Sequence, residues 1–193
     1  MTVKALDHDF RPDQKVTPFG IYLPHTGELY LYLTTSRVTS DFIVDCLTDF
    51  WQTVKAQFPQ VTSLLINADN GPENHSRRTQ FMFRLTQLAD DQQLHLRLAY
   101  YPPYHSKYNP IERVWGGLEQ HWNGTLLDQV DTVVAFAKSF IWRQLQPVVS
   151  QVRKVYHTGQ TLSKPAMQLL ERTRFHRLPG LDKWFVSIFP TTP

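Results

Sequence analysis

The sequence predicts a mixed α/β fold, in which a central sheet is flanked by helices. Three observations predict it. Two aromatic-rich segments near the N-terminus alternate around a short turn, as in a β-hairpin. Two later apolar segments have the length and composition of strands, and segments with apolar residues three and four positions apart separate them. Strands that alternate with helices in this order are typical of one mixed sheet with helices on its faces.

Size and composition fit one domain with a substantial core. The chain has 193 residues, of which 41% are hydrophobic and 19% are charged. It has no apolar run long enough to span a membrane and no signal-peptide core near Met1. Its one cysteine, Cys46, lies in an apolar helical pattern and is expected to be a buried thiol. We therefore expect a cytoplasmic protein, and its net charge of +3 permits nucleic-acid binding without demonstrating it.

The first elements are a hairpin and a helix. The hairpin covers residues 19–33, with a Pro-His-Thr-Gly turn at its centre. The helix covers 40–58, with either Thr39 or Ser40 as its N-cap and Pro59 after its end.

A buried strand, a helix and a second strand follow. The strand over 63–68 is almost continuously apolar, as expected where helices cover both faces of a sheet, and it ends on Asp69. An Asn-Gly-Pro turn leads to an amphipathic helix over 77–91. Residues 94–100 alternate, which predicts a half-buried strand that Pro102 stops.

The next helix begins at a recognisable cap. Asn109 is expected at the N-cap and Pro110 at the first helical position, where a missing N–H costs nothing. Glu112 then falls in the first turn of a helix that runs to about residue 123. A further helix is predicted over 127–145.

These elements divide the chain into a domain over 1–147 and a C-terminal extension over 148–193 that packs on it. The extension is more polar, with a short helix near Lys164 and an apolar end over 184–189.

Asp69 and Glu112 are the candidate metal ligands. An acid at the carboxyl end of a strand projects into the crevice where open α/β sheets place their sites. Alone, Asp69 could equally shape its turn, and Glu112 could equally complete a helix cap. Two such acids near neighbouring strand ends suit a divalent cation held by carboxylates.

Two stretches resemble the catalytic half of a DDE transposase of a bacterial insertion sequence, in the mariner-like and retroviral-integrase superfamily. They are Asp-Asn-Gly-Pro-Glu-Asn at 69–74 and Tyr-Pro-Pro-Tyr-His-Ser-Lys-Tyr-Asn-Pro-Ile-Glu-Arg-Val-Trp at 101–115. The resemblance runs from about residue 4 to about residue 185. It implies a ribonuclease H-like sheet, two Mg²⁺ (or Mn²⁺) ions in the intact enzyme, and DNA partners, namely insertion-sequence ends and target DNA. It also implies a homo-oligomer when full length, and it gives Asp69 and Glu112 the roles of the second and third catalytic acids.

Further polar residues of the two stretches are candidates for DNA contact or for orienting the acids. For His105 a solvated loop histidine is an equal alternative, and the tyrosines at 100, 101, 104 and 108 could stack on bases or simply pack around prolines. Glu73 and Glu119 are weaker metal candidates, and Arg77 and Arg78 are expected to be solvated. The candidates for DNA contact or orientation are Asn70, Asn74, His105, Lys107, Asn109 and Arg113.

The first acid of a DDE triad has no clear counterpart. In the family it lies on a central strand just before the hairpin, and only Asp7 and Asp9, with Asp13 weaker still, lie nearby. We expect that this strand is missing through N-terminal truncation, which would leave an open gap between the hairpin and the strand that ends at Asp69. Three functions remain open: a truncated transposase catalytic domain, weakly active or inactive alone; a non-catalytic DNA- or transposase-binding fragment; and a ribonuclease H-like metal-dependent nuclease that uses Asp7.

Overall fold

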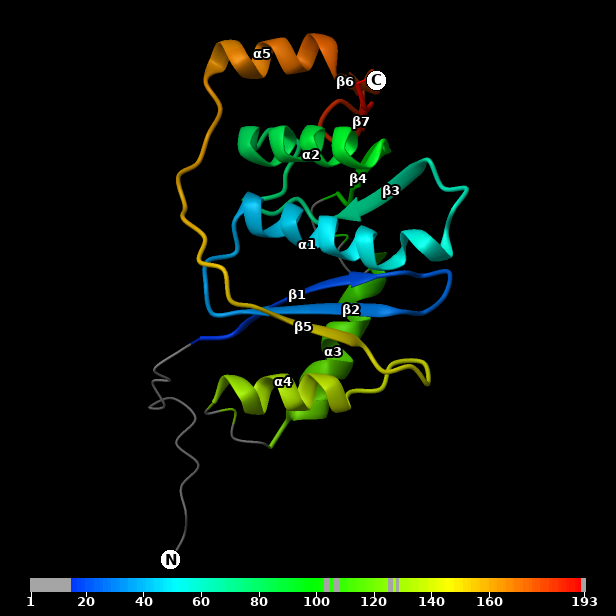
Figure 1. Ribbon diagram of the computed structural model, residues 1–193, viewed down its shortest axis with the longest axis vertical. Coiled ribbons are helices and arrows are strands. Elements are labelled where there is room, and N and C mark those ends of the chain that lie inside the picture. The colour runs from blue at the N-terminus through cyan, green and yellow to red at the C-terminus, as the bar shows by residue number, and fades with distance from the viewer. Residues whose placement is uncertain (1–14, 103–104, 106–107, 125–126, 128, 192–193) are drawn as a thin grey trace, which may run out of the picture.

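The computed structural model describes residues 15–102, 105, 108–124, 127 and 129–191. These residues form two β-sheets and five α-helices, so the predicted α/β class is confirmed (Figure 1). Within these ranges no helix is long and apolar enough to cross a membrane.

The first sheet contains the predicted hairpin. β1 (Thr17–Tyr22) pairs antiparallel with β2 (Leu29–Thr34), and β5 (Val148–Val152) pairs parallel with the other side of β2. The turn is closed by backbone hydrogen bonds between Leu23 and Glu28 and from Gly27 to Leu23, and Gly27 adopts a φ of 81° that favours glycine. The strand order β1-β2-β5 leaves β2 at the centre of this sheet.

The second sheet has the order β3-β4-β7-β6. β3 (Ser63–Ala68) pairs parallel with β4 (His95–Tyr100), which pairs antiparallel with β7 (Phe185–Ile188). β6 (Phe175–Arg177) completes the sheet beside β7. The segment 148–193 therefore supplies strands to both sheets, which the sequence analysis did not predict.

Five α-helices surround the sheets, together with a short 3-10 helix (Lys55–Gln57). Thr39 is the N-cap of the first helix, because its side chain accepts a hydrogen bond from Phe42 N. Figure 1 shows α1 on one side of the first sheet and α3 with α4 on the other. The helices are α1 (Ser40–Val54), α2 (Thr79–Gln92), α3 (Pro110–Trp122), α4 (Val130–Ser139) and α5 (Lys164–Thr173).

The core is divided by the alternation of side chains along β2. Tyr30 and Tyr32 belong to a cluster with α1, α2, β4 and β7, which also contains the buried Cys46. Leu31 and Leu33 face the opposite way and pack with α3 and α4. Because successive side chains of a strand point to opposite faces, one strand joins the two clusters.

Three sequence-based expectations are wrong. The hairpin and the strand before Asp69 lie in separate sheets, because no described strand connects β1 with β3. β3 is not covered on both faces: its residues alternate between exposed and half-buried, and Leu65 is 56% exposed. α4 ends at Ser139 rather than near 145, because the backbone is extended at Phe140 and then forms a tight turn between Trp142 and Leu145.

Candidate active site

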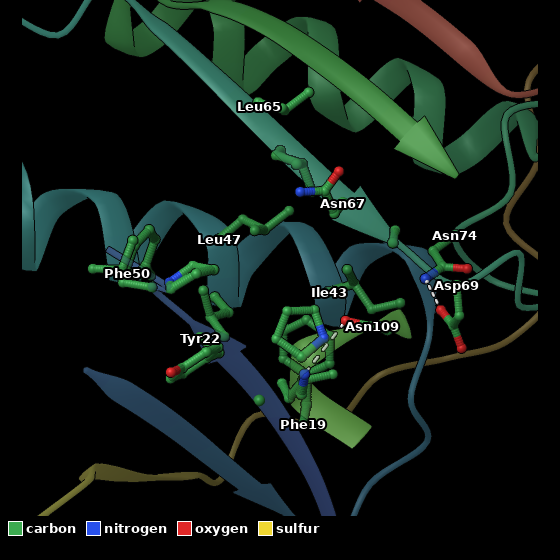
Figure 2. Close-up of a pocket in the computed structure, with 18 of the residues that line it drawn as sticks. Phe19, Tyr22, Ile43, Leu47, Phe50, Leu65, Asn67, Asp69, Asn74 and Asn109 are labelled. Atoms are coloured by element: carbon green, nitrogen blue, oxygen red, sulfur yellow. Dashed lines mark hydrogen bonds between the residues drawn. The ribbon is translucent and has the colours of Figure 1, made fainter. Parts of the chain in front are cut away.

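A cavity of approximately 410 Å³ lies between β1 and β3. Both strands line it along their length, and α1 contributes the apolar side chains of Ile43, Leu47 and Phe50 (Figure 2). The start of α3 contributes further lining residues, including Ile111 and Glu112. The cavity occupies the place where the sequence predicted a gap beside the Asp69 strand. Residues 1–14, with Asp7, Asp9 and Asp13, lie outside the described residues.

Asp69 lies at one end of this cavity, directly after β3. Its carboxylate is exposed, and Asn74 Nδ2 donates a hydrogen bond of 2.7 Å to Oδ1 (Figure 2). Gly71 lies inside this turn, where a Cβ would come within 3.0 Å of Asn74 Oδ1. The turn thus holds one carboxylate oxygen of Asp69, while Oδ2 takes no part in that bond.

Asn74 is in turn fixed by a buried tyrosine. The Tyr100 hydroxyl, at the end of β4, donates a hydrogen bond of 2.7 Å to Asn74 O. Tyr100 is only 6% exposed, and burial raises the pKa of its hydroxyl, which therefore stays protonated as a donor at neutral pH. Because Tyr100 is buried, the structure supports packing rather than stacking on bases. Its hydrogen bond to the Asp69 turn was not predicted from the sequence.

Glu112 reaches the cavity from the first turn of α3. Asn109 is the N-cap as predicted: it is 8% exposed, and its side chain accepts a hydrogen bond from Ile111 N at 3.4 Å. Pro110 is the first helical residue, so Glu112 is the third, and its side chain is exposed. Asp69 and Glu112 line the same cavity, although they come from different elements.

A close contact fixes the position of α3 against β1. A Cβ on Gly20 would lie 2.7 Å from the Trp115 ring and 2.9 Å from Ile111 Cδ1. Only a glycine lets the helix approach the strand this closely. The glycine in the hairpin strand thus helps to bring the first turn of α3, with Glu112, to the rim of the cavity.

The other candidates lie in different surroundings. Asn70 and Arg113 are exposed and do not line the cavity, and Lys107 and Tyr104 lie outside the described residues. His105 is exposed, and its ring stacks on Tyr108 with centroids 5.9 Å apart.

The weaker metal candidates are not part of the cavity lining. Glu73 accepts hydrogen bonds from Ser40 and forms an ion pair of 3.2 Å with Arg78, so it ties the start of α1 to the turn. Arg78 is therefore paired rather than solvated, contrary to expectation. Glu119 is exposed further along α3.

The described residues suit one divalent cation better than two. They contain no group of three or more His, Cys, Asp or Glu side chains that could hold a metal. Mg²⁺ keeps several waters and is commonly bound through one or two carboxylates, so Asp69 and Glu112 fit such an ion chemically. A two-ion site would need a further acid.

Comparison with known families agrees with this reading. A family model described as the Rhodopirellula transposase DDE domain matches residues 1–190. The chain therefore belongs to this family of DDE transposase domains, and the resemblance noted in the sequence is confirmed. Membership of this family suggests a role in the DNA cleavage and transfer of transposition, and it implies DNA as the partner. DDE transposase domains generally use divalent metal ions. No curated protein and no solved structure matches the chain.

Proposed function

We propose that this chain is the catalytic domain of an insertion-sequence transposase, in which Asp69 and Glu112 are two of the acids that bind Mg²⁺ or Mn²⁺. The observation that carries the proposal is that Asp69 and Glu112 both line one cavity in a chain of the DDE transposase family. Bacterial origin, a cytoplasmic location and a homo-oligomeric full-length state are parts of the same proposal.

Two asparagines would orient the acids that bind the metal. Asn74 holds Oδ1 of Asp69, so the carboxylate keeps one orientation in which Oδ2 can bind a cation. Asn109 caps α3 and so sets the direction from which Glu112 approaches. When bound, the metal supplies activation of water or a DNA 3′-hydroxyl and stabilisation of the leaving oxygen.

Residues around the mouth of the site would contact DNA. Asn70 is exposed directly beside Asp69, and Arg113 is exposed directly after Glu112, so both can reach a phosphate near the acids. The stacked pair of His105 and Tyr108 precedes the cap of α3, and we place Lys107, between them in sequence, in the same role.

The fold is proposed to be ribonuclease H-like, and no strand lies between β1 and β3 among the described residues. One further strand between β1 and β3 would join the two sheets into a single mixed sheet, and in the family that strand carries the first acid. The cavity lined by both strands supports this proposal. We therefore propose that the chain is weakly active or inactive alone, because Asp69 and Glu112 are the only acids among the described residues that line the cavity.

The test is a strand-cleavage assay on labelled insertion-sequence end DNA with Mg²⁺ or Mn²⁺. The chain alone should give little or no cleavage. Any cleavage should disappear in Asp69→Asn and Glu112→Gln and persist in Asp91→Asn, which changes an exposed aspartate of α2. Cleavage that survives both Asp69→Asn and Glu112→Gln would contradict the proposed site.

A second candidate is a non-catalytic fragment that binds DNA or a full-length transposase. The described residues contain no group of three or more His, Cys, Asp or Glu side chains that could hold a metal, and this favours it. It predicts DNA binding that Asp69→Asn leaves unchanged and no cleavage with either metal. Metal-dependent cleavage that Asp7→Asn abolishes would instead support the nuclease alternative.

A further inference from the structure

We propose that Glu73 is a positioning residue of the active site, which holds the turn over residues 69–74 against the starts of two helices and so sets the direction of the Asp69 carboxylate. Glu73 is not among the residues that line the cavity, so it acts through the turn rather than on the metal. Its expected effect on metal binding rests on the proposed function, whereas its effect on the geometry of the turn does not.

The first argument is that Glu73 is bound to the start of α1. Ser40 N donates a hydrogen bond of 3.1 Å to Glu73 Oε2, and the Ser40 hydroxyl shares its proton between Glu73 O at 2.8 Å and Oε2 at 3.1 Å. Ser40 is buried and is the first residue of α1, where backbone N–H groups have no partner within the helix. A carboxylate in this position also interacts favourably with the helix dipole. Both the side chain and the backbone of Glu73 are therefore anchored to a packed helix.

The second argument is that the same carboxylate is bound to the start of α2. Arg78, the N-cap residue of α2, pairs with Glu73 Oε2 through Nη2 at 3.2 Å and through Nε at 3.3 Å. The two side chains are 21% and 26% exposed, so the ion pair is partly shielded from solvent. α1 and α2 begin at the same end of the molecule (Figure 1), where Gln80 Nε2 also donates a hydrogen bond of 2.8 Å to Asp41 Oδ1. Glu73 therefore connects the turn to two helices that are themselves held together.

The third argument is that the Asn74 side chain depends on its backbone for direction. Asn74 Nδ2 donates to Asp69 Oδ1 (Figure 2), whereas Asn74 Oδ1 is buried and has no hydrogen-bond partner in the described part of the chain. The backbone is held at two successive residues, because Glu73 O accepts from the Ser40 hydroxyl and Asn74 O accepts from the Tyr100 hydroxyl. A rotation of the backbone at residue 73 would move Asn74 Nδ2 away from the Asp69 carboxylate. The anchor at Glu73 thus acts on Asp69 through Asn74.

These contacts disfavour Glu73 as a metal ligand. Its Oε2 already accepts hydrogen bonds from Ser40 and Arg78, and a cation bound there would lie beside the guanidinium of Arg78, which carries the same sign of charge. The two roles also differ in what they require of the side chain. A metal ligand needs the negative charge of the carboxylate, whereas a positioning residue at this place needs an oxygen that accepts from Ser40 N.

The experiment compares Glu73→Ala with Glu73→Gln by calorimetric titration with Mn²⁺. Both variants lose the same charge, but the glutamine keeps an oxygen that can accept the hydrogen bond from Ser40 N. Glu73→Ala should weaken Mn²⁺ binding about tenfold or more, as is typical for residues that orient metal ligands. Glu73→Gln should bind Mn²⁺ more tightly than Glu73→Ala. Equal losses in the two variants would overturn the proposal, and so would Mn²⁺ binding that Asp69→Asn weakens and Glu73→Ala does not.

Asp90 provides a matched control, because its carboxylate also binds both an arginine and a backbone N–H. It accepts hydrogen bonds of 2.6 Å from Arg174 Nη2 and 2.7 Å from Thr191 N, near the end of α2 that lies away from Arg78. Asp90→Ala should therefore reduce stability without disturbing the turn over residues 69–74, and it should bind Mn²⁺ like the parent chain. A loss of Mn²⁺ affinity as large as that of Glu73→Ala would assign both effects to general destabilisation and overturn the proposal.

The side-chain amide of Asn74 gives a readout that needs neither metal nor DNA. In metal-free NMR spectra its resonances report the hydrogen bond to Asp69, and Asp69→Asn provides the reference without that carboxylate. Glu73→Ala should move these resonances toward the reference, and Asp90→Ala should leave them at the parent position. Resonances that do not move in Glu73→Ala would overturn the proposal. Resonances that move, together with Mn²⁺ binding that Asp69→Asn leaves unchanged, would support the positioning role and count only against the proposed metal site.

Discussion

β2 and β3 are apolar strands of equal length, yet they have different surroundings. β2 lies between β1 and β5, and all six of its residues are buried. β3 is at a sheet edge beside the cavity, and its residues alternate between exposed and half-buried. The difference comes from the neighbours of each strand rather than from its composition. The same substitution should therefore have very different effects in the two strands.

Leu33→Ala in β2 should have the largest effect. Leu33 is fully buried between the first sheet and the helices α3 and α4. Its truncation should reduce the free energy of unfolding by about 2–5 kcal/mol through lost burial and a residual cavity. Leu65→Ala in β3 should cost about 0.5 kcal/mol or less, as for exposed sites. Urea unfolding of both variants measures the difference, and equal losses would mean that β3 is covered in solution.

Gly20→Ala tests the contact between β1 and α3. The new Cβ would lie 2.7 Å from the Trp115 ring, so we expect a loss of about 1–3 kcal/mol from overpacking. Gly116→Ala, on the exposed side of α3, is the control, because a Cβ there meets nothing within 4 Å. It should stabilise the helix by up to about 1 kcal/mol. Thermal unfolding should shift in opposite directions; a stable Gly20→Ala variant would show that the helix can move away from β1.

Tyr100→Phe tests the support of the Asp69 turn. The change removes the hydrogen bond to Asn74 O and leaves a half-buried carbonyl without that donor. We expect a loss of about 1 kcal/mol in the free energy of unfolding. Because Asn74 holds Asp69, amide hydrogen exchange should also increase over residues 69–75. Unchanged exchange in this turn would show that Tyr100 contributes to packing alone.

The smallest expected effect is a pH dependence in the well-packed half of the molecule. Asp45 is partly buried, which raises its pKa, but hydrogen bonds from Lys154, Arg84 and Tyr156 outweigh burial, so its pKa is lowered overall. Its contribution to stability is therefore present above the unfolded-state pKa near 3.8 and is lost as the pH falls through the lower folded-state pKa. Asp45→Asn should flatten the stability profile below about pH 5. An acid limb of the stability profile that is unchanged in Asp45→Asn would contradict the assignment.

The local elements could be predicted from the sequence because short-range signals specify them. The Pro-His-Thr-Gly turn of the hairpin, Thr39 as a cap, and the Asn109-Pro110 start of α3 are all found as expected. The sequence predicts an end for α4 that is too late, because the apolar pattern continues through Phe140 and Ile141 although the backbone turns there.

The long-range pairing could not be predicted in the same way. β7 lies between β4 and β6, yet its apolar sequence alone indicated only a segment that docks on the domain. The single predicted sheet is two sheets, because pairing depends on which strand lies between β1 and β3 rather than on either strand alone. For the site, the sequence identified Asp69 and Glu112 as candidates, but it did not reveal the support that Tyr100 and Gly20 give to the elements that carry them.

The central claim is that Asp69 and Glu112 share one divalent ion, and calorimetric titration with Mn²⁺ tests it most directly. The parent chain and Asp91→Asn should bind one ion with the same affinity. Asp69→Asn and Glu112→Gln should each weaken Mn²⁺ binding about tenfold or more. The double variant should lose less binding free energy than the sum of the two single losses, because both side chains bind the same ion. Mn²⁺ binding that neither single substitution changes, or losses that simply add, would contradict a shared site.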